Sequence, residues 1–246
     1  MVLHSQKIKT TSSATSHKGL RRKINEDSIV SLPNQGLWVV ADGMGGHSRG
    51  DYASQTITRA LEDLTLIRGQ DLSVYSNAVI NCVRGVNNHL VERGSEPDTG
   101  VIGSTLAALI IDGNRCGLLW AGDSRIYRQR GKSLDQLTDD HSFVNELISQ
   151  GKLSANEAAA HPDANAITRA IGASYDLDLD QTTESVISGD RFLLCSDGLY
   201  REVSNSDLLE VMSSNRNTKD TMDRLLELAL EGGGRDNISI IVVEIS

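Results

Sequence analysis

Apolar side chains occupy both faces of one stretch near the end of the chain, Ile238-Ser239-Ile240-Ile241-Val242-Val243-Glu244-Ile245. Side chains alternate along an extended strand, so positions 238, 240 and 242 would share one face and positions 241, 243 and 245 the other. A strand that is apolar on both faces is buried between two layers of structure. The stretch therefore predicts a layered fold in which about 237–245 is an inner strand.

Further strands and three amphipathic helices precede this segment. Strand-like apolar runs cover about 26–32, 36–41, 104–111, 115–122, 124–130 and 190–196, with a hairpin tip at Arg130-Gly131-Lys132. Apolar stripes at helical spacing cover 53–64, 79–90 and 222–230. Two strands precede two helices, and at least three strands then follow without a helix, which argues against alternating β-α-β units. We therefore expect an α+β fold of antiparallel sheets with helices on their outer faces.

Residues 141–176 interrupt this pattern. They predict a short helix at 142–150, a turn at Gly151, a second short helix from Ser154 and a polar segment around His161 and Pro162. Long connections of this kind usually carry function or move. We expect a flap inserted beside the functional site.

Composition indicates an ordinary globular protein. The chain has 246 residues, 39% of them hydrophobic and 23% charged, and only three prolines, with no low-complexity stretch that would mark a linker. We therefore expect a single domain over residues 1–246. The net charge of −9 makes nucleic acid an unsuitable partner for the surface as a whole.

The three cysteines, Cys82, Cys116 and Cys195, are odd in number and lie in apolar segments, which indicates reduced, buried thiols. The first ten residues lack the apolar stretch of a signal peptide, and no run approaches the ~20 apolar residues of a membrane span. These features favour a cytoplasmic protein that does not bind membranes. A monomer is the default expectation.

Carboxylates recur where short apolar runs meet a turn. The sites are Asp42, Asp123, Asp197, Asp236 and the pair Glu26-Asp27. A single Asp at a strand end is usually a turn residue. Five such sites from distant parts of one chain predict a shared metal centre, because Mg²⁺ and Mn²⁺ prefer oxygen ligands.

The segment Ala41-Asp42-Gly43-Met44-Gly45-Gly46-His47 contains the most informative of these sites. Gly43 has no Cβ, so the backbone can turn sharply and point a carbonyl oxygen into the site beside the Asp42 carboxylate. A plain glycine turn is the alternative for this segment taken alone. The glycines match neither the P-loop motif nor the dinucleotide-binding glycine motif, so we discount nucleotide binding.

Four basic residues of the segment 18–23 directly precede Glu26 and Asp27. In an acidic protein, a basic cluster beside candidate metal ligands suggests an anionic substrate. The planar fork of Arg suits phosphate, because it can donate two parallel hydrogen bonds. A solvated basic turn is the alternative interpretation.

Six motifs together resemble those of the metal-dependent PPM (PP2C-type) serine/threonine protein phosphatases in their compact bacterial form. The resemblance covers residues 12–245, and the order and spacing of the motifs make it specific. The motifs are Arg22-x-x-Asn25-Glu26-Asp27, Ala41-Asp42-Gly43-Met44-Gly45-Gly46-His47, Gly103-Ser104-Thr105, Ala121-Gly122-Asp123-Ser124-Arg125, Leu194-Cys195-Ser196-Asp197-Gly198-Leu199 and Arg235-Asp236-Asn237.

The resemblance implies a four-layer α/β/β/α sandwich, in which two antiparallel sheets lie face to face between helices. It also implies a centre of two Mn²⁺ or Mg²⁺ ions that activates water for attack on phosphorus. Carried over to matching positions, Asp42 would bridge the two metals, and Arg22 would bind the substrate phosphate. Asp197 and Asp236 would complete the shell of one ion, and the Gly43 carbonyl and Glu26 that of the other.

Bacterial members often bind a third, weaker metal, and Asp123 and Asp197 match its ligand positions. Asn165 of the flap falls where some relatives place a further ligand. No cysteine nucleophile is implied, and we interpret Cys195 as a core residue.

The chain departs from animal members of the family at Met44, where they carry a His that is a proposed acid for the leaving alkoxide. The nearest histidine is His47, which is our candidate acid, with a metal-bound water as the alternative. His141 and His161 lie in or near the flap, where they could cap helices or contact substrate.

The resemblance implies hydrolysis of phosphoserine and phosphothreonine in proteins. Bacterial phosphatases of this size commonly oppose a Hanks-type serine/threonine kinase, so that kinase and its targets are the expected partners. Some short members with a stretch like Trp120 to Arg125 serve type VI secretion. Two other functions stay open: a non-catalytic binding module on the same fold, and a phosphatase of small metabolites.

Overall fold

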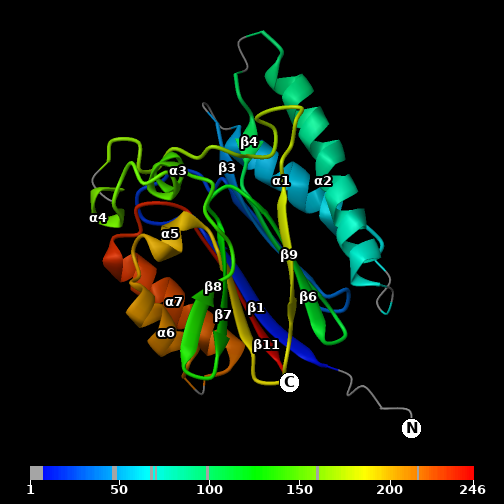
Figure 1. Ribbon diagram of the computed structural model, residues 1–246, viewed down its shortest axis with the longest axis vertical. Coiled ribbons are helices and arrows are strands. Elements are labelled where there is room, and N and C mark those ends of the chain that lie inside the picture. The colour runs from blue at the N-terminus through cyan, green and yellow to red at the C-terminus, as the bar shows by residue number, and fades with distance from the viewer. Residues whose placement is uncertain are drawn as a thin grey trace.

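Two antiparallel β-sheets lie face to face, and helices cover the outer face of each (Figure 1). The structure is a computed structural model, and it describes residues 8–45, 49–66, 69, 71–97, 100–158, 161–214 and 216–246. The two predicted features of the fold, antiparallel sheets and helices on their outer faces, are confirmed.

The first sheet has the strand order β1-β11-β10-β7-β8, and its neighbouring strands are all antiparallel. The strands are β1 (Thr10–His17), β7 (Arg125–Arg130), β8 (Ser133–Gln136), β10 (Arg191–Cys195) and β11 (Ile238–Ile245).

The second sheet has the order β2-β3-β5-β6-β9, and the short β4 pairs with the end of β3. The strands are β2 (Asp27–Leu32), β3 (Leu37–Met44), β4 (Gly103–Ser104), β5 (Leu106–Asp112), β6 (Arg115–Ala121) and β9 (Asp180–Ser185).

Helices α1 (Gly50–Glu62) and α2 (Leu72–Gly94) cover the second sheet, and α5 (Asp197–Tyr200), α6 (Asn205–Met212) and α7 (Thr218–Gly232) cover the first. Three apolar clusters separate the four layers. One lies between α1, α2 and the second sheet, one lies between the sheets, and one lies between the first sheet and α5 to α7. The hydrophobic effect thus holds each layer against the next.

Strand β11 behaves as its sequence predicts. Ile238, Ile240 and Val242 pack toward the helices, whereas positions 241, 243 and 245 pack between the sheets. The predicted strands and helices are all present, and their ends differ by at most seven residues, at the start of α2. Strands β1 and β9 were not predicted, because they are polar edge strands whose sequences, Thr10–His17 and Asp180–Ser185, lack an apolar pattern.

The segment 141–176 contains α3 (Phe143–Ser149) and α4 (Ala155–Ala158), as predicted. Ser142 caps α3, because its side chain accepts a hydrogen bond from the backbone N–H of Asn145. An isolated bridge between Ser142 and Ile167 closes the segment on itself, and a second between Ile171 and Ser104 attaches it to β4.

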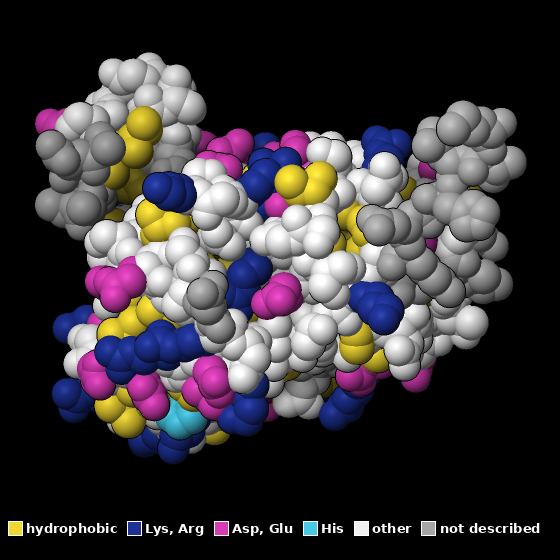
Figure 2. All heavy atoms as spheres, turned by 90° about the horizontal axis from the view of Figure 1, so that it is seen from below, with side chains coloured by type: hydrophobic (Ala, Val, Ile, Leu, Met, Phe, Trp, Pro, Cys, Tyr) yellow, Lys and Arg dark blue, Asp and Glu magenta, His cyan; other side chains and the backbone are white. Residues whose placement is uncertain are grey.

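Within the described ranges, no helix is both long and apolar enough to cross a membrane. Figure 2 shows the molecule from below the view of Figure 1. Basic and acidic side chains are interspersed on this face, and its hydrophobic side chains form separate small patches. This face therefore offers neither a uniform charge nor a broad apolar surface.

The inter-sheet core predicts that truncating a buried side chain of β11 lowers the stability of the protein. Ile241→Ala should lower the free energy of unfolding by about 2–5 kcal/mol, because it removes buried methylene and methyl groups and leaves a cavity. Urea denaturation measures this change. The control is Ile187→Ala, whose side chain is 51% exposed and should change stability by only about 0.5 kcal/mol. Equal losses in the two variants would contradict the layered core.

Candidate functional site

A cavity of about 350 Å³ opens where β3, β6 and β10 end and β11 begins. Seven of the eight predicted site residues line it: Arg22, Glu26, Asp42, Gly43, Asp123, Asp197 and Asp236. The eighth, His47, lies outside the described residues. The fold therefore brings together carboxylates that are up to about two hundred positions apart in the sequence.

Backbone hydrogen bonds fix Asp42 near the end of β3. Its N–H donates to the Thr105 hydroxyl at 3.0 Å, and its carbonyl accepts from the Thr105 N–H at 2.8 Å. Thr105 Oγ1 also lies 2.7 Å from the hydroxyl of Ser124, the residue that follows Asp123. Thr105 thus links the Asp42 strand to the Asp123 turn.

Gly43 and Gly50 let the backbone of β3 approach the start of α1. A Cβ on Gly43 would collide with the backbones of Gly50 and Glu26. A Cβ on Gly50 would lie 2.6 Å from the Gly43 carbonyl oxygen and 2.6 Å from Glu26 Oε1. The two oxygens that were predicted to bind the same ion therefore converge on one small space. The Gly50 N–H also donates to the Glu26 carboxylate.

Asp236 lies at the entry to β11 and forms an ion pair with Arg22, whose Nη2 is 2.7 Å from Asp236 Oδ2. The next residue, Asn237, braces the loop that carries Arg22 and Glu26. Its side-chain oxygen accepts from the Glu26 N–H at 2.8 Å, and its amide donates to the carbonyls of Lys18 and Ile24 at 2.9 Å. Asn237 thereby positions the loop against β11.

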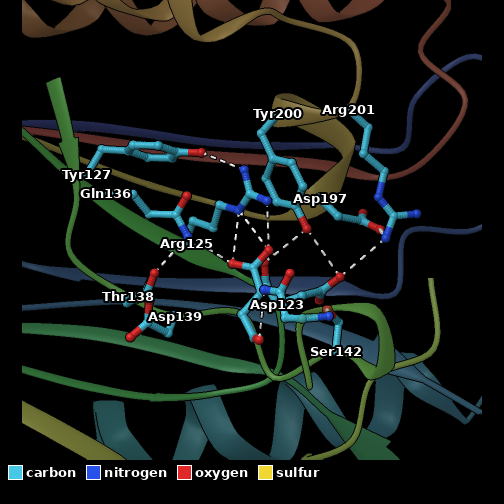
Figure 3. A network of polar contacts seen from close by, with 12 residues as sticks. Asp123, Arg125, Tyr127, Gln136, Thr138, Asp139, Ser142, Asp197, Tyr200 and Arg201 are labelled. Atoms are coloured by element: carbon cyan, nitrogen blue, oxygen red, sulfur yellow. Dashed lines mark hydrogen bonds and ion pairs between the residues drawn. The ribbon is translucent and has the colours of Figure 1, made fainter. Parts of the chain in front are cut away.

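Asp197 begins α5, and Asp123 follows β6. Arg201 lies between them, with its Nη2 3.0 Å from Asp197 Oδ2 and 3.2 Å from Asp123 Oδ2 (Figure 3). Asp197 Oδ1 is buried and has no hydrogen-bond partner. Such a buried oxygen is costly unless another group, such as a cation, satisfies it.

Burial raises the pKa values of these carboxyl groups, and their mutual repulsion adds to the effect. Burial is the largest cause for Asp42, whose pKa lies well above its usual value, and Asp27, Asp197, Asp123 and Asp236 raise it further. Burial likewise raises the pKa of Asp197 to about 7. Ionising the whole cluster is therefore unfavourable without added positive charge.

The donor set fits divalent cations. It consists of carboxylate oxygens and one peptide carbonyl, which are the ligands of hard ions such as Mg²⁺ and Mn²⁺. Among the described residues, no three His, Cys, Asp or Glu side chains already form a closed metal shell. Arg22 and Arg201 instead hold oxygens of Asp236, Asp123 and Asp197.

Three residues that shape the site were not predicted as site residues: Thr105, Arg201 and Asn237. Asp27 was predicted only as one of the clustered carboxylates, without a ligand role. Asp27 pairs with Asp42 across β2 and β3 and accepts a hydrogen bond from Ser196 at 2.7 Å. Burial raises its pKa to about 6. The motifs that carried the resemblance contained Asp27, Thr105 and Asn237, but they gave no sign of the contacts that these residues make.

The histidines of the flap region have structural partners. His141 is 7% exposed, accepts from the Gly122 N–H at 3.2 Å and lies 3.2 Å from Asp180 Oδ2. His161 packs on Phe143 and accepts from the Asp163 N–H. Asn165 and Met44 do line the cavity.

Cys195 is a core residue, as predicted, and it packs between the first sheet and its helices. Burial raises the pKa of its thiol to about 12, so it is a poor nucleophile. Cys82 and Cys116 are also free thiols. Cys116 is buried, as predicted, whereas Cys82 is only half-buried.

Comparisons with known proteins identify relatives along nearly the whole chain. The profile described as Protein phosphatase 2C matches residues 16–231. The serine/threonine protein phosphatase PstP of Mycobacterium tuberculosis is 39% identical over 233 residues, which are 94% of this chain and 44% of PstP. The chain therefore spans less than half the length of that relative.

Solved structures share the fold. PppA, described as a key regulatory component of T6SS in Pseudomonas aeruginosa, is 39% identical, with a TM-score of 0.89 over 97% of this chain and 98% of that one. The catalytic domain of PstP in complex with two manganese ions is 36% identical, with a TM-score of 0.84 over 97% of this chain and 99% of that one.

Carboxylate repulsion in the cavity predicts a stabilising substitution. Asp42→Asn should raise the free energy of unfolding in EDTA by about 1–3 kcal/mol, because it removes a buried group that is costly to ionise beside four other aspartates. Thermal unfolding at neutral pH measures the change. Mn²⁺ should raise the melting temperature of the parent protein but not that of the variant.

The control for this comparison is Asp176→Asn, which removes an exposed carboxylate. It should leave both the melting temperature in EDTA and the response to Mn²⁺ unchanged. If Asp42→Asn destabilised the metal-free protein, or if it kept the full Mn²⁺ response, the assignment of Asp42 to the cluster would be wrong.

Proposed function

The chain belongs to the protein phosphatase 2C family, and we propose that it hydrolyses phosphoserine and phosphothreonine in proteins with divalent metal ions as cofactors. The family predicted from the motifs is thus confirmed. One observation carries the proposal of activity: five carboxylates and the Gly43 carbonyl line one cavity that also contains Arg22. A binding module that had lost catalysis would not need to retain this complete set.

The cavity residues would hold two ions, Mn²⁺ or Mg²⁺. Asp42 would contact both, Asp197 and Asp236 would bind one, and Glu26 and the Gly43 carbonyl would bind the other. The similar catalytic domain of PstP was solved in complex with two manganese ions, which supports a count of two ions. When bound, such ions supply the Lewis acidity that makes water a nucleophile near neutral pH. Asp123 and Asp197, with Asn165 of the flap, would hold a weaker third ion.

Arg22 would bind the substrate phosphate. Its side chain is 51% exposed and lines the cavity, so the guanidinium can reach a phosphate that enters from solvent. The ion pair with Asp236 orients it toward the carboxylates. Arg22 would therefore position the phosphate and stabilise negative charge on its oxygens.

Within the cavity, other residues of the chain would hold the ligands in place. Thr105 fixes Asp42, the Gly50 N–H orients Glu26, and Asn237 holds the loop that carries Glu26. For the proton that the leaving alkoxide needs, His47 stays our predicted donor.

The proposed partners are phosphorylated proteins, among them a Hanks-type kinase and its targets. The likeness to PppA supports type VI secretion components as further proposed substrates. We further propose that residues 1–246 work as one domain in which 141–176 serve as a flap, and that the protein is a cytoplasmic monomer.

The direct test is hydrolysis of a phosphothreonine peptide by purified protein, first in EDTA and then with added Mn²⁺. We expect turnover only with Mn²⁺, and a loss of at least about a hundredfold in kcat for Asp197→Asn, because the variant removes a metal ligand. Parent-like turnover in the folded variant would show that Asp197 is not part of the centre.

Two other outcomes of this test select the alternatives. If the protein hydrolysed small phosphate esters but not phosphopeptides, a metabolite phosphatase would be favoured. An absence of turnover in folded, Mn²⁺-loaded protein would favour a binding module.

The role of Arg22 predicts a specific kinetic change. Arg22→Ala should raise KM for the phosphopeptide by about tenfold or more, because it removes a charge-assisted hydrogen bond to phosphate. The matched control is Arg21→Ala, which removes an exposed arginine of the same loop that does not line the cavity. If the two variants changed KM equally, phosphate binding would have to be assigned to another residue.

A further inference from the structure

Arg201 places a positive charge between two carboxylates of the cavity. A single nitrogen, Nη2, lies 3.0 Å from Asp197 Oδ2 and 3.2 Å from Asp123 Oδ2. Figure 3 shows the Arg201 side chain reaching from α5 toward Asp123. One nitrogen that contacts both carboxylates occupies the place where one small cation would contact both.

Asp123 has a second side-chain partner besides Arg201. The Tyr200 hydroxyl donates to Asp123 Oδ2 at 3.1 Å and to its backbone carbonyl at 3.0 Å. The Arg125 guanidinium lies 3.6 Å from the centre of the Tyr200 ring and forms a bidentate ion pair with Asp140. Figure 3 shows Tyr200 between Arg125 and Asp123. Tyr200 therefore contacts the same Asp123 oxygen as Arg201 and would continue to hold this carboxylate if Arg201 moved away.

The Asp197 carboxylate is buried and incompletely satisfied. It is 8% exposed, and it lines the cavity. Its Oδ2 faces Arg201, whereas its Oδ1 has no hydrogen-bond partner. A buried carboxylate oxygen without a partner indicates that a further positive group belongs in the cavity.

We propose that Arg201 is an internal cation that competes with a divalent metal ion for the Asp123–Asp197 pair. The ion binds there only when it displaces the guanidinium, so the position fills at a higher metal concentration than the rest of the centre. The side chain is 32% exposed, which leaves it room to swing into solvent. This inference rests on the proposed function, because it concerns metal loading of the same cavity.

The test is a titration of the purified full chain with Mn²⁺, in which free ion is measured by electron paramagnetic resonance and bound ion by difference. Arg201→Met removes the charge but keeps most of the length of the side chain. We expect this variant to bind Mn²⁺ at its weakest site at least about tenfold more tightly than the parent protein, because a charged competitor is gone. Arg201→Lys, which retains a positive charge, should restore the parent affinity.

The control is Arg224→Met on α7. It removes an equal charge at an arginine that is ion-paired with Glu227 and does not line the cavity. It should leave Mn²⁺ binding unchanged. Adding Asp123→Asn to Arg201→Met should abolish the gain. Circular dichroism verifies folding, and Arg201→Gln replaces Arg201→Met if that variant does not fold.

Equal Mn²⁺ affinity and stoichiometry in the parent protein and in the neutral Arg201 variant would overturn the inference. If Asp42→Asn still lost Mn²⁺ in that case, the proposed metal centre would stand. An absence of Mn²⁺ binding in every variant would overturn both proposals. A gain that survived Asp123→Asn would also overturn the inference, because the new affinity would then come from another pair.

Discussion

Repulsion among the carboxylates gathered in one cavity is the constraint on which the rest of the site depends. Burial and proximity raise the pKa values of Asp42 and Asp197, so the cluster is costly to ionise. Two arginines, Arg22 and Arg201, offset part of that charge, and one oxygen of Asp197 stays without a partner. A cavity of this kind is poorly suited to a purely structural role. Divalent cations would offset the repulsion and would provide a partner for the unpaired Asp197 oxygen.

Burial of apolar side chains in the layered core offsets the destabilising burial and repulsion of the carboxylates. Three apolar clusters hold four layers together, and the site lies at the ends of the strands, where loops from both sheets meet. Close backbone contacts then set its geometry. A Cβ on Gly198 would collide with the carbonyl of Asn237, so α5 can lie against the entry to β11 only because residue 198 is glycine. The geometry of the proposed metal centre therefore depends on close packing of the elements that carry its residues.

Much of this organisation was predictable from the sequence. Inner strands such as β11 are apolar on both faces, and the carboxylates follow apolar runs, so both leave a local pattern. Edge strands β1 and β9 leave none, because their sequences are polar and each is placed by backbone pairing with one neighbouring strand. The roles of Asn237 and Arg201 could not be predicted from the sequence either. Asn237 braces a loop more than two hundred residues away, and Arg201 meets Asp123 only in the folded chain.

The central claim is that the clustered carboxylates form a divalent metal centre. The most direct measurement is anomalous X-ray diffraction from crystals of the full chain grown with Mn²⁺. The account predicts anomalous peaks within the cavity, one in contact with Asp42, Asp197 and Asp236 and one in contact with Asp42 and the Gly43 carbonyl. A well-ordered cavity without such peaks, in which Arg22 still contacts Asp236 and Arg201 still contacts Asp197, would contradict it.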